Sequence, residues 1–306
     1  GFIAGRFAEE YRFVNQGRIL GVASRTAPKA KAFAQRYGIP RAYRGYEQLL
    51  RDEEIHVVYI ATPHNLHHEN TLQALTHGKA VLCEKPAAVN SSQLNQMTET
   101  AKNENLLFME AMWTSFLPVI RQVKQWIEDG RIGEVRIIEA SFGAYSETDP
   151  GHRLYNPELA GGALLDIGIY PLAFANIMST SKPAEITARS FTGETGVDET
   201  TAMLIQYENG ALAQLHCSIK HTTDHRARIY GTKGMIDVPD FWRAKEASLS
   251  GDEETLTTSD DRKSAGFRFE IEEMNRLLRE NLKESTMMPH RSEERRVGKE
   301  CVSECR

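Results

Sequence analysis

Short apolar runs alternate with helix-like segments through the first third of the chain, and this alternation restricts the possible folds more than any other feature. Runs of strand length occupy 18–24, 55–61, 80–83 and 106–109. Helix-like segments lie at 26–38, at 46–51, at 66–78 and from Ser91 or Ser92 onward. Strands separated by single helices at this spacing predict a parallel, doubly wound α/β sheet. The chain opens on a helix-like segment directly after Gly1, so we expect a first strand to be missing in front of it.

A different pattern begins after about Trp113. A helix is predicted over 118–130, another around 163–177, and a last one with an apolar stripe from Phe267 to Leu282. Strand signals dominate the rest, at 135–142, 186–191, 201–207, 211–219, 226–230 and 235–238. Asn209-Gly210 predicts a tight hairpin because both residues tolerate positive φ, and 231–234 predicts a second. This half is expected to be an α+β domain with a large, mostly antiparallel, open sheet.

The change of pattern divides the chain into three predicted parts, at 1–117, 118–290 and 291–306. The last part, RSEERRVGKECVSECR, shows no apolar stripe of helical or strand period. Its segment 291–301 resembles the translation of a common sequencing-library adapter. We interpret 291–306 as a non-native tail, and the alternative is a solvated, charged tail.

Composition narrows the classes of protein. The 306 residues are 41% hydrophobic and 26% charged, which suits a globular chain of about two domains. The net charge of −5 disfavours a nucleic-acid binder, which usually shows a basic face. No apolar run approaches the length of a membrane span, and no secretory leader is visible. The four cysteines match no zinc pattern, so a reduced, cytoplasmic protein is expected.

Two segments at predicted strand ends carry candidate chemistry. Residues 61–67, ATPHNLH, follow the most apolar strand, where α/β sheets bind ligands. The alternative is an ordinary turn between strand and helix, in which Pro63 stops the strand. In 83–86, CEKP, Lys85 offers a mobile cation that can bond a substrate oxygen, and the alternative is a surface Lys–Glu pair. No carboxylate or cysteine shares the spacing of the histidines at 64, 67 and 68, so no metal site is expected.

A third candidate segment opens the helix around 163–177. In GGALLDIGIY, 161–170, Asp166 and Tyr170 are four residues apart and therefore share a helical face. A carboxylate, a phenol and a lysine form a workable proton-transfer set around a carbonyl or an alcohol. The alternative is a helix N-terminus with a half-buried tyrosine.

These segments, taken in order, resemble the Gfo/Idh/MocA family of NAD(P)-dependent oxidoreductases, in particular its subgroup of diol dehydrogenases. The resemblance covers residues 1 to about 290. The motifs that carry it are GFIA (1–4), VASR (22–25), YIATPHNLHHE (59–69), VLCEKP (81–86), MEAMW (109–113), GGALLDIGIY (161–170), GTKGMIDVPDFW (231–242) and MMPH (287–290). The resemblance implies a Rossmann domain followed by an α+β domain that forms a homodimer through its open sheet.

The resemblance also assigns a cofactor site. Gly1 and Ala4 take the places of the second glycine and the last small residue of a G-x-G-x-x-A loop, with the pyrophosphate at the start of the helix that carries Phe2 and Ile3. Ser24 and Arg25 stand where an acidic residue would bind the ribose of NAD, so NADP is favoured, with NAD as the other possibility. The other expected cofactor residues are Thr62, Pro63, His64, His67, Glu84 and Lys85.

For catalysis the resemblance implies hydride transfer to or from a sugar, polyol or cyclic diol. Tyr170 is the expected general acid and base. Lys85 would form a hydrogen bond with the reacting oxygen and lower the pKa of the Tyr170 phenol. Asp166 would orient Lys85 or the substrate. The expected substrate residues are Trp113, Phe142, Arg153, Phe241 and Trp242. Two other functions stay open, an NAD-dependent glycosidase of the same superfamily and a dinucleotide sensor without catalysis.

Overall fold

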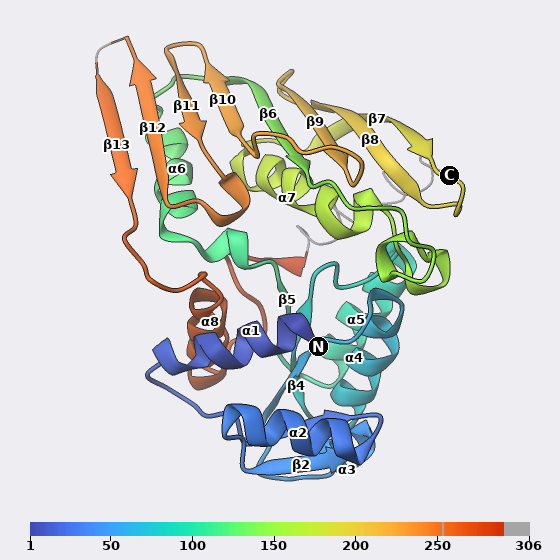
Figure 1. The fold of residues 1–306 in the computed structure, drawn as a ribbon. Coiled ribbons are helices and arrows are strands. Elements are labelled where there is room, and N and C mark those ends of the chain that lie inside the picture. The colour runs from blue at the N-terminus through green and yellow to red at the C-terminus, as the bar shows by residue number, and fades with distance from the viewer. Residues whose placement is uncertain (253, 291–306) are drawn as a thin grey trace.

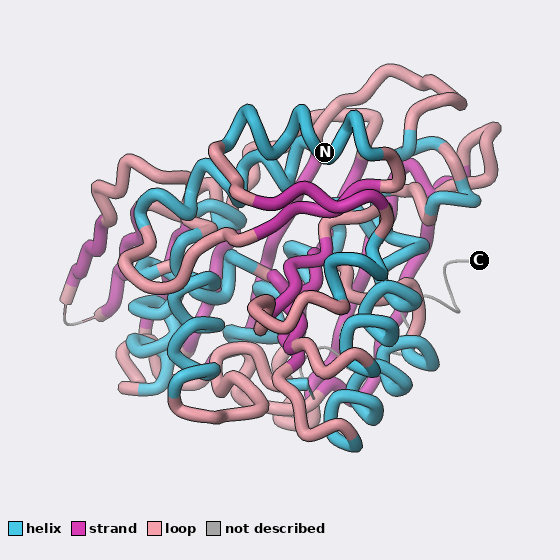
Figure 2. The backbone as a smooth tube through the Cα atoms, turned by 90° about the horizontal axis from the view of Figure 1, so that it is seen from below, coloured by secondary structure: helices cyan, strands magenta, loops and turns pink. Residues whose placement is uncertain are grey.

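The amino-terminal third of the molecule contains two small sheets of parallel strands. The computed structural model describes residues 1–252 and 254–290; the predicted tail at 291–306 lies outside them. Strand β1 (Gly21–Ser24) pairs with β2 (Arg41–Arg44), and β4 (Ala80–Glu84) lies between β3 (Val57–Ile60) and β5 (Phe108–Ala111). These strands alternate with α1 (Phe2–Glu10), α2 (Ala27–Tyr37), α3 (Tyr46–Leu50), α4 (His67–Thr76) and α5 (Ser91–Asn103). The view from below shows helices around the central strands (Figure 2).

Local sequence explains the boundaries of these helices. Helix α2 has Pro28 in its first turn and ends at Gly38, whose φ of 65° is in the left-handed region that favours glycine. The side chain of Asn90 caps α5 by accepting a hydrogen bond from the Gln93 amide at 2.9 Å. Strand β4 is buried along its whole length, as its apolar sequence predicts. The parallel α/β prediction is therefore confirmed, although β2 was missed because its sequence, RAYR, has polar ends and an exposed face.

The other sheet is a single eight-stranded layer across the top of the molecule (Figure 1). Its order is β13-β12-β11-β10-β6-β9-β8-β7, and all neighbours are antiparallel except β6 and β9. The strands are β6 (Val135–Gly143), β7 (Pro183–Thr192), β8 (Asp198–Tyr207), β9 (Leu212–Ser218), β10 (Ala227–Gly231), β11 (Gly234–Val238), β12 (Glu246–Gly251) and β13 (Thr255–Ser259). The predicted mostly antiparallel sheet and both hairpins are confirmed. Strands β12 and β13 were missed.

Two helices cover one face of this sheet, α6 (Pro118–Glu128) and α7 (Ile169–Met178) (Figure 1). A π-helical turn over Leu164–Gly168 leads into α7. Within the described residues, one helical stretch, Pro157–Met178, is long and apolar enough to cross a membrane, and 78% of its most apolar window is buried inside the protein. Such burial is typical of a core helix.

The last helix, α8 (Arg268–Arg279), leaves the large sheet and returns to α1 (Figure 1). The Ala265 and Gly266 amides donate to the carboxylate of Glu10 at 2.8 and 3.1 Å. Further along, Nε2 of His290 lies 2.9 Å from the carbonyl oxygen of Phe108. The carboxyl-terminal segment of the chain thus closes the molecule by packing against its amino-terminal part.

Candidate active site

Lys85 lies where the two parts of the molecule meet. It follows β4 directly, and its side chain is 13% exposed. Its Nζ donates to the carbonyl oxygen of Asp166 at 2.5 Å and lies 3.5 Å from Oδ1 of the same residue. The same Nζ lies 5.0 Å from the ring centroid of Tyr170. The structure thus brings together the lysine, the carboxylate and the phenol that were predicted from separate segments.

Two more side chains contact the Asp166 carboxylate. Nη1 of Arg153 donates to Oδ1 at 3.0 Å and Nη2 to Oδ2 at 3.3 Å, and Nε2 of His64 lies 3.7 Å from Oδ1. Burial raises the pKa of Asp166, but the charges of Lys85 and Arg153 outweigh it and hold this pKa below its usual range. Asp166 is therefore a stable anion that fixes two cations.

The charges of Lys85 and Tyr170 depend on the same neighbours. Burial lowers the pKa of Lys85, but Tyr170, Asp166 and Glu84 together raise it above its ordinary value. Burial raises the pKa of Tyr170, and Lys85 and the hydrogen bond from Trp113 only partly oppose this. The expected lowering by Lys85 is present, but the net shift is upward. Both groups are therefore protonated at neutral pH.

The hydroxyl group of Tyr170 keeps its own hydrogen available. It accepts a hydrogen bond from Nε1 of Trp113 at 3.2 Å. A phenol has one hydrogen to donate, and Trp113 does not accept it because its indole nitrogen is only a donor. This geometry suits proton transfer to or from a substrate oxygen.

Aromatic rings form the other side of the site. Phe142 lies 5.4 Å from Tyr170 and 5.1 Å from Trp242 between ring centroids, and Trp113 lies 5.7 Å from Trp242. His225, which sequence reasoning missed, lies 4.7 Å from Phe142. Trp113, Phe142 and Trp242 therefore gather beside Tyr170. Such rings can pack against the apolar face of a cyclic molecule.

Phe241 is not part of this group. Its side chain is fully buried and packs at 5.3 Å against Phe174 of α7. Of these two neighbours only Trp242 contacts the rings beside Tyr170, and the expected contact of Phe241 with substrate stays a prediction.

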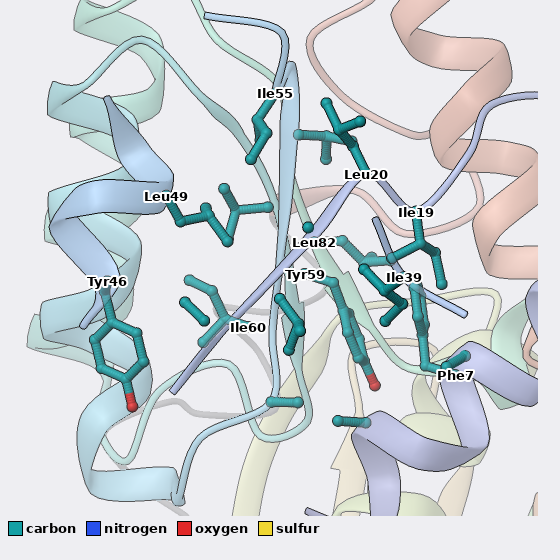
Figure 3. A pocket seen from close by; sticks show the side chains of 18 of the residues that line it. Phe7, Ile19, Leu20, Ile39, Tyr46, Leu49, Ile55, Tyr59, Ile60 and Leu82 are labelled. Carbon is teal, nitrogen blue, oxygen red and sulfur yellow. The ribbon is translucent and has the colours of Figure 1, made fainter. Parts of the chain in front are cut away.

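A cavity of about 1330 Å³ opens beside this site, and part of the predicted cofactor set lines it. The members that line it are Gly1, Ala4, Ser24, Arg25, Thr62 and Pro63. Helix α1 begins directly after Gly1, and the N-terminus of a helix favours a phosphate. Arg25 adds a cation to the cavity lining. These residues fit a dinucleotide. Apolar side chains form the interior of the cavity (Figure 3).

Other residues predicted to touch the cofactor make contacts within the protein. Both ring nitrogens of the fully buried His67 lie 2.8 Å from carbonyl oxygens, those of Thr62 and Pro86. The ring therefore ties together the two loops that follow β3 and β4. Phe2 and Ile3 also lie away from the cavity lining: Phe2 is 79% exposed, and Ile3 packs against the core.

His64 and Glu84 also make protein contacts. Nδ1 of His64 lies 3.2 Å from the carbonyl oxygen of Ala160, and burial, with the charge of Lys85, lowers the pKa of His64 to about 3, so its ring is neutral. Glu84 accepts hydrogen bonds from the hydroxyl group of Tyr59 and from the Lys85 amide. These contacts support the loop that carries Lys85, and the expected cofactor contacts of His64 and Glu84 stay predictions.

Two buried acids, Glu270 and Asp198, were missed by sequence reasoning. Burial and the nearby charges of Glu84 and Glu110 raise the pKa of Glu270. Asp198 accepts hydrogen bonds from the Leu164 amide at 2.7 Å and from Thr201, at the start of the turn that carries Asp166. Across the described ranges, no cluster of three histidine, cysteine or acidic side chains could hold a metal ion.

Comparisons with known proteins now identify the family. Residues 1–112 match the family model described as oxidoreductase family, NAD-binding Rossmann fold, and residues 120–237 match that of the GFO/IDH/MocA C-terminal domain. The chain belongs to the Gfo/Idh/MocA family. It is therefore an NAD(P)-dependent oxidoreductase with a Rossmann domain, as the motifs predicted.

Curated relatives give the same result over most of the chain. A trans-1,2-dihydrobenzene-1,2-diol dehydrogenase from Xenopus tropicalis is 37% identical over 279 residues, which are 89% of this chain and 84% of that protein. The Bos taurus protein of the same name is 35% identical over 300 residues, 94% of this chain and 89% of its own.

Solved structures share the fold. KijD10, a 3-ketoreductase from Actinomadura kijaniata in complex with NADP and TDP-benzene, superposes with a TM-score of 0.86 at 24% identity, over 98% of this chain and 92% of its own. The aldose-aldose oxidoreductase from Caulobacter crescentus superposes with a TM-score of 0.88 at 22% identity. The match covers 97% of this chain and 92% of that protein.

Proposed function

We propose that the protein transfers a hydride between NADP and a carbon that carries a hydroxyl or carbonyl group in a cyclic diol, a sugar or a polyol. The observation that carries this proposal is the position of Lys85, whose Nζ lies 5.0 Å from the Tyr170 ring and is bonded to Asp166. The curated relatives named as diol dehydrogenases support a diol. The aromatic side chains beside Tyr170 supply an apolar surface for a ring.

In this mechanism the chain supplies the proton and the charge. A bound nicotinamide supplies or accepts the hydride. When a carbonyl is reduced, Tyr170 gives its phenolic proton to the substrate oxygen, and the charge of Lys85 stabilises the oxygen and then the phenolate. In the oxidation of an alcohol the proton returns to Tyr170. Asp166 keeps Lys85 protonated and aimed at the same point.

We propose NADP as the preferred cofactor because of the end of β1. Ser24 and Arg25 line the cavity there, and no acidic side chain occupies either position. A guanidinium group binds a phosphate through two parallel hydrogen bonds, whereas a ribose hydroxyl is better bound by a carboxylate. Arg25→Ala should weaken the use of NADP much more than that of NAD.

We further propose a cytoplasmic homodimer. The open face of the large sheet exposes Phe191 of β7 by 66% and Leu204 of β8 by 45%. Exposed apolar side chains on an open sheet are typical of a surface that pairs with a second copy. Sedimentation of the protein should give twice the mass of one chain, and Leu204→Lys should reduce it to one.

The test of the function compares two reactions. We would follow absorbance at 340 nm with diols, aldoses and inositols, using NADP⁺ and NAD⁺ in turn, alongside the cleavage of aryl glycosides. The proposal expects net formation of NADPH with at least one of these alcohols. Glycoside cleavage without net change at 340 nm would indicate the superfamily's NAD-dependent glycosidase, and binding of the cofactor with neither reaction would indicate a sensor.

A further inference from the structure

Two loops of the large sheet meet beside the aromatic rings of the site. One loop joins β9 to β10 and carries His225, and the other joins β11 to β12 and carries Asp240 and Trp242. Nδ1 of His225 lies 3.8 Å from Oδ1 of Asp240, and the Phe241 amide donates to the carbonyl oxygen of His225 at 3.1 Å. The two loops are therefore joined at this point through side chains and through backbone.

Both residues of this contact have an unusual backbone conformation. The φ of His225 is 52° and that of Asp240 is 46°, in the left-handed region that favours glycine. Other residues keep such a conformation where the surrounding contacts strongly determine it, and these residues gather at ligand sites. Since the pair lies beside the rings of the site, the contacts of His225 call for a functional explanation.

The other ring nitrogen of His225 fixes the end of β6. Nε2 lies 2.7 Å from the carbonyl oxygen of Gly143, which can only accept, so Nε2 carries a hydrogen and donates it. The Gly143 amide donates in turn to Oγ1 of Thr223 at 2.9 Å. The approach is close, because a Cβ on Gly143 would lie 2.6 Å from the carbonyl oxygen of His221. The loop that carries His225 thus holds the end of β6 directly after Phe142.

The ring of His225 contacts two of the rings that lie beside Tyr170. Its centroid lies 4.7 Å from that of Phe142 and 6.4 Å from that of Trp242. Phe142 and Trp242 lie 5.4 and 5.9 Å from Tyr170 between ring centroids, and 5.1 Å from each other. We call Phe142 and Trp242 the aromatic wall. His225 packs against both members of this wall and is bonded to both segments that carry them.

We propose that His225 is a positioning residue that fixes the spacing of the aromatic wall and thereby favours cyclic over open-chain alcohols as substrates. Its Nε2 holds the strand end that carries Phe142, while its Nδ1 and its carbonyl oxygen hold the turn that carries Trp242. The apolar face of a ring gains most from a surface that is already in place, whereas an open chain adapts to a surface that shifts. The inference rests on the proposed function, because it takes a cyclic alcohol as the substrate.

The test removes the ring of His225 and leaves the backbone in place. In His225→Gly the new residue adopts a φ of 52° without strain, and free imidazole can refill the space of the lost ring. The matched control is Asn105→Gly, since Asn105 also has a positive φ, of 54°, and lies after α5. The two ligands are trans-cyclohexane-1,2-diol and hexane-1,2-diol, which have the same number of carbons and hydroxyl groups.

Two measurements separate this inference from the proposed function. Steady-state kinetics with NADP⁺ give kcat and KM for each alcohol. Titration of tryptophan fluorescence gives a Kd for each alcohol without any turnover, because Trp113 and Trp242 lie beside Tyr170. If no alcohol causes a net change at 340 nm with the parent protein, the proposed function fails, and the Kd values alone decide the inference.

The proposal expects KM and Kd for the cyclic diol to rise about fivefold in His225→Gly, while kcat and the values for the open-chain diol stay within about twofold. Added imidazole should restore at least half of the lost affinity, and Asn105→Gly should behave as the parent protein.

Three results would overturn the proposal: equal losses for the two diols, a loss that imidazole does not restore, or a parent protein that binds the ring no better than the chain. Should His225→Gly fail to fold, His225→Asn replaces it, since asparagine also tolerates a positive φ. The selective loss of the cyclic diol is then required of that variant.

Discussion

The candidate active site has two halves that are built in different ways. In the charged half, Lys85 donates to the backbone carbonyl oxygen of Asp166, and the Asp166 carboxylate contacts both Lys85 and Arg153. The lysine and the aspartate are 81 positions apart in sequence. In the aromatic half, Phe142 and Trp242 contact each other and Tyr170 only through ring packing. Tyr170 belongs to both halves. The comparison teaches that the charged half needs every one of its partners to be present. The aromatic half depends instead on the total apolar area that its rings offer.

This difference predicts where substitutions act. Removing one member of a buried ion pair leaves an uncompensated charge, which is costly in a medium of low dielectric constant. Removing one ring from a packed group loses contact area but leaves no charge unpaired. We therefore expect changes in the charged half to reduce kcat and changes in the aromatic half to raise KM.

The largest effect is expected from Lys85→Met. The variant removes the ammonium group that stabilises the reacting oxygen while keeping most of the side-chain volume, so kcat should fall about 10³-fold. The control is Lys79→Met, since Lys79 is also a buried lysine but donates to the carbonyl oxygen of Asp52, away from the site. Steady-state kinetics of both variants check this, and a Lys85→Met enzyme with unchanged kcat would remove Lys85 from the mechanism.

Tyr170→Phe should have the next largest effect. The ring and its contacts with Phe142 remain, but the proton of the hydroxyl group is lost, so kcat should fall about 10²-fold with little change in KM. Tyr155→Phe is the control, because the Tyr155 hydroxyl donates to Ser146 and takes no part in the site. A change in KM alone would place Tyr170 in the aromatic half only.

Asp166→Asn should reduce kcat about tenfold and alter its pH dependence. Asp166 is one of the groups that raise the pKa of Lys85. The ammonium form is required, so activity is lost as the pH rises through this pKa. Without the carboxylate the pKa of Lys85 falls, and the alkaline loss of activity begins at a lower pH. Asp198→Asn is the control: it changes the acid that accepts from the Leu164 amide and should leave the alkaline limb in place.

The charged half could be predicted from sequence because each member follows a recognisable element. Lys85 comes directly after a buried strand, and Asp166 opens an apolar helix. What the pattern could not provide is the contact of Arg153 with Asp166, since the direction of a long side chain in a loop depends on packing. The net pKa of Tyr170 was missed for the same reason, because its burial depends on the whole fold.

The strands of the fold were predictable where their apolar runs are strong. Prediction failed for strands with weak apolar runs. Strand β2 has polar ends, and β13, with the sequence TLTTS, holds a single leucine on an edge of the sheet, so neither reads as an apolar run. Threonine is nevertheless a good strand former, so the three threonines were a usable signal for β13. Phe241 and Trp242 show a limit of prediction from sequence. When two aromatic residues are adjacent, composition does not say which of the two rings faces a site.

Trp242→Ala tests the aromatic half. We expect KM for a cyclic substrate to rise about fivefold while kcat stays within about twofold, because the lost contact area serves binding of both the ground state and the transition state. Phe241→Ala is the matched control. Its ring packs in the core against Phe174, so it should lower the melting temperature and leave KM unchanged in the folded enzyme. Equal KM effects in both variants would remove the distinction between the two neighbours.

The smallest effect concerns Glu270, a buried acid that lacks the partners of Asp166. Both of its carboxyl oxygens are buried without a hydrogen bond to any residue in 1–252 or 254–290, and burial, with the charges of Glu84 and Glu110, raises its pKa well above the ordinary value. The folded state therefore holds a proton that the unfolded state releases above about pH 4.5, so this group stabilises the fold less as the pH rises. Glu270→Gln removes that dependence. The melting temperature of the Glu270→Gln variant should exceed that of the parent protein by about 2 °C at pH 8, and by less at pH 5. This shift corresponds to a difference of about 1 kcal/mol in the free energy of unfolding.

Glu273→Gln is the control of opposite sign. Hydrogen bonds from Arg276 and Ser285 lower the pKa of Glu273 despite partial burial, so its replacement should be more destabilising at pH 8 than at pH 5. Thermal unfolding at the two pH values separates a buried carboxyl group with partners from one without.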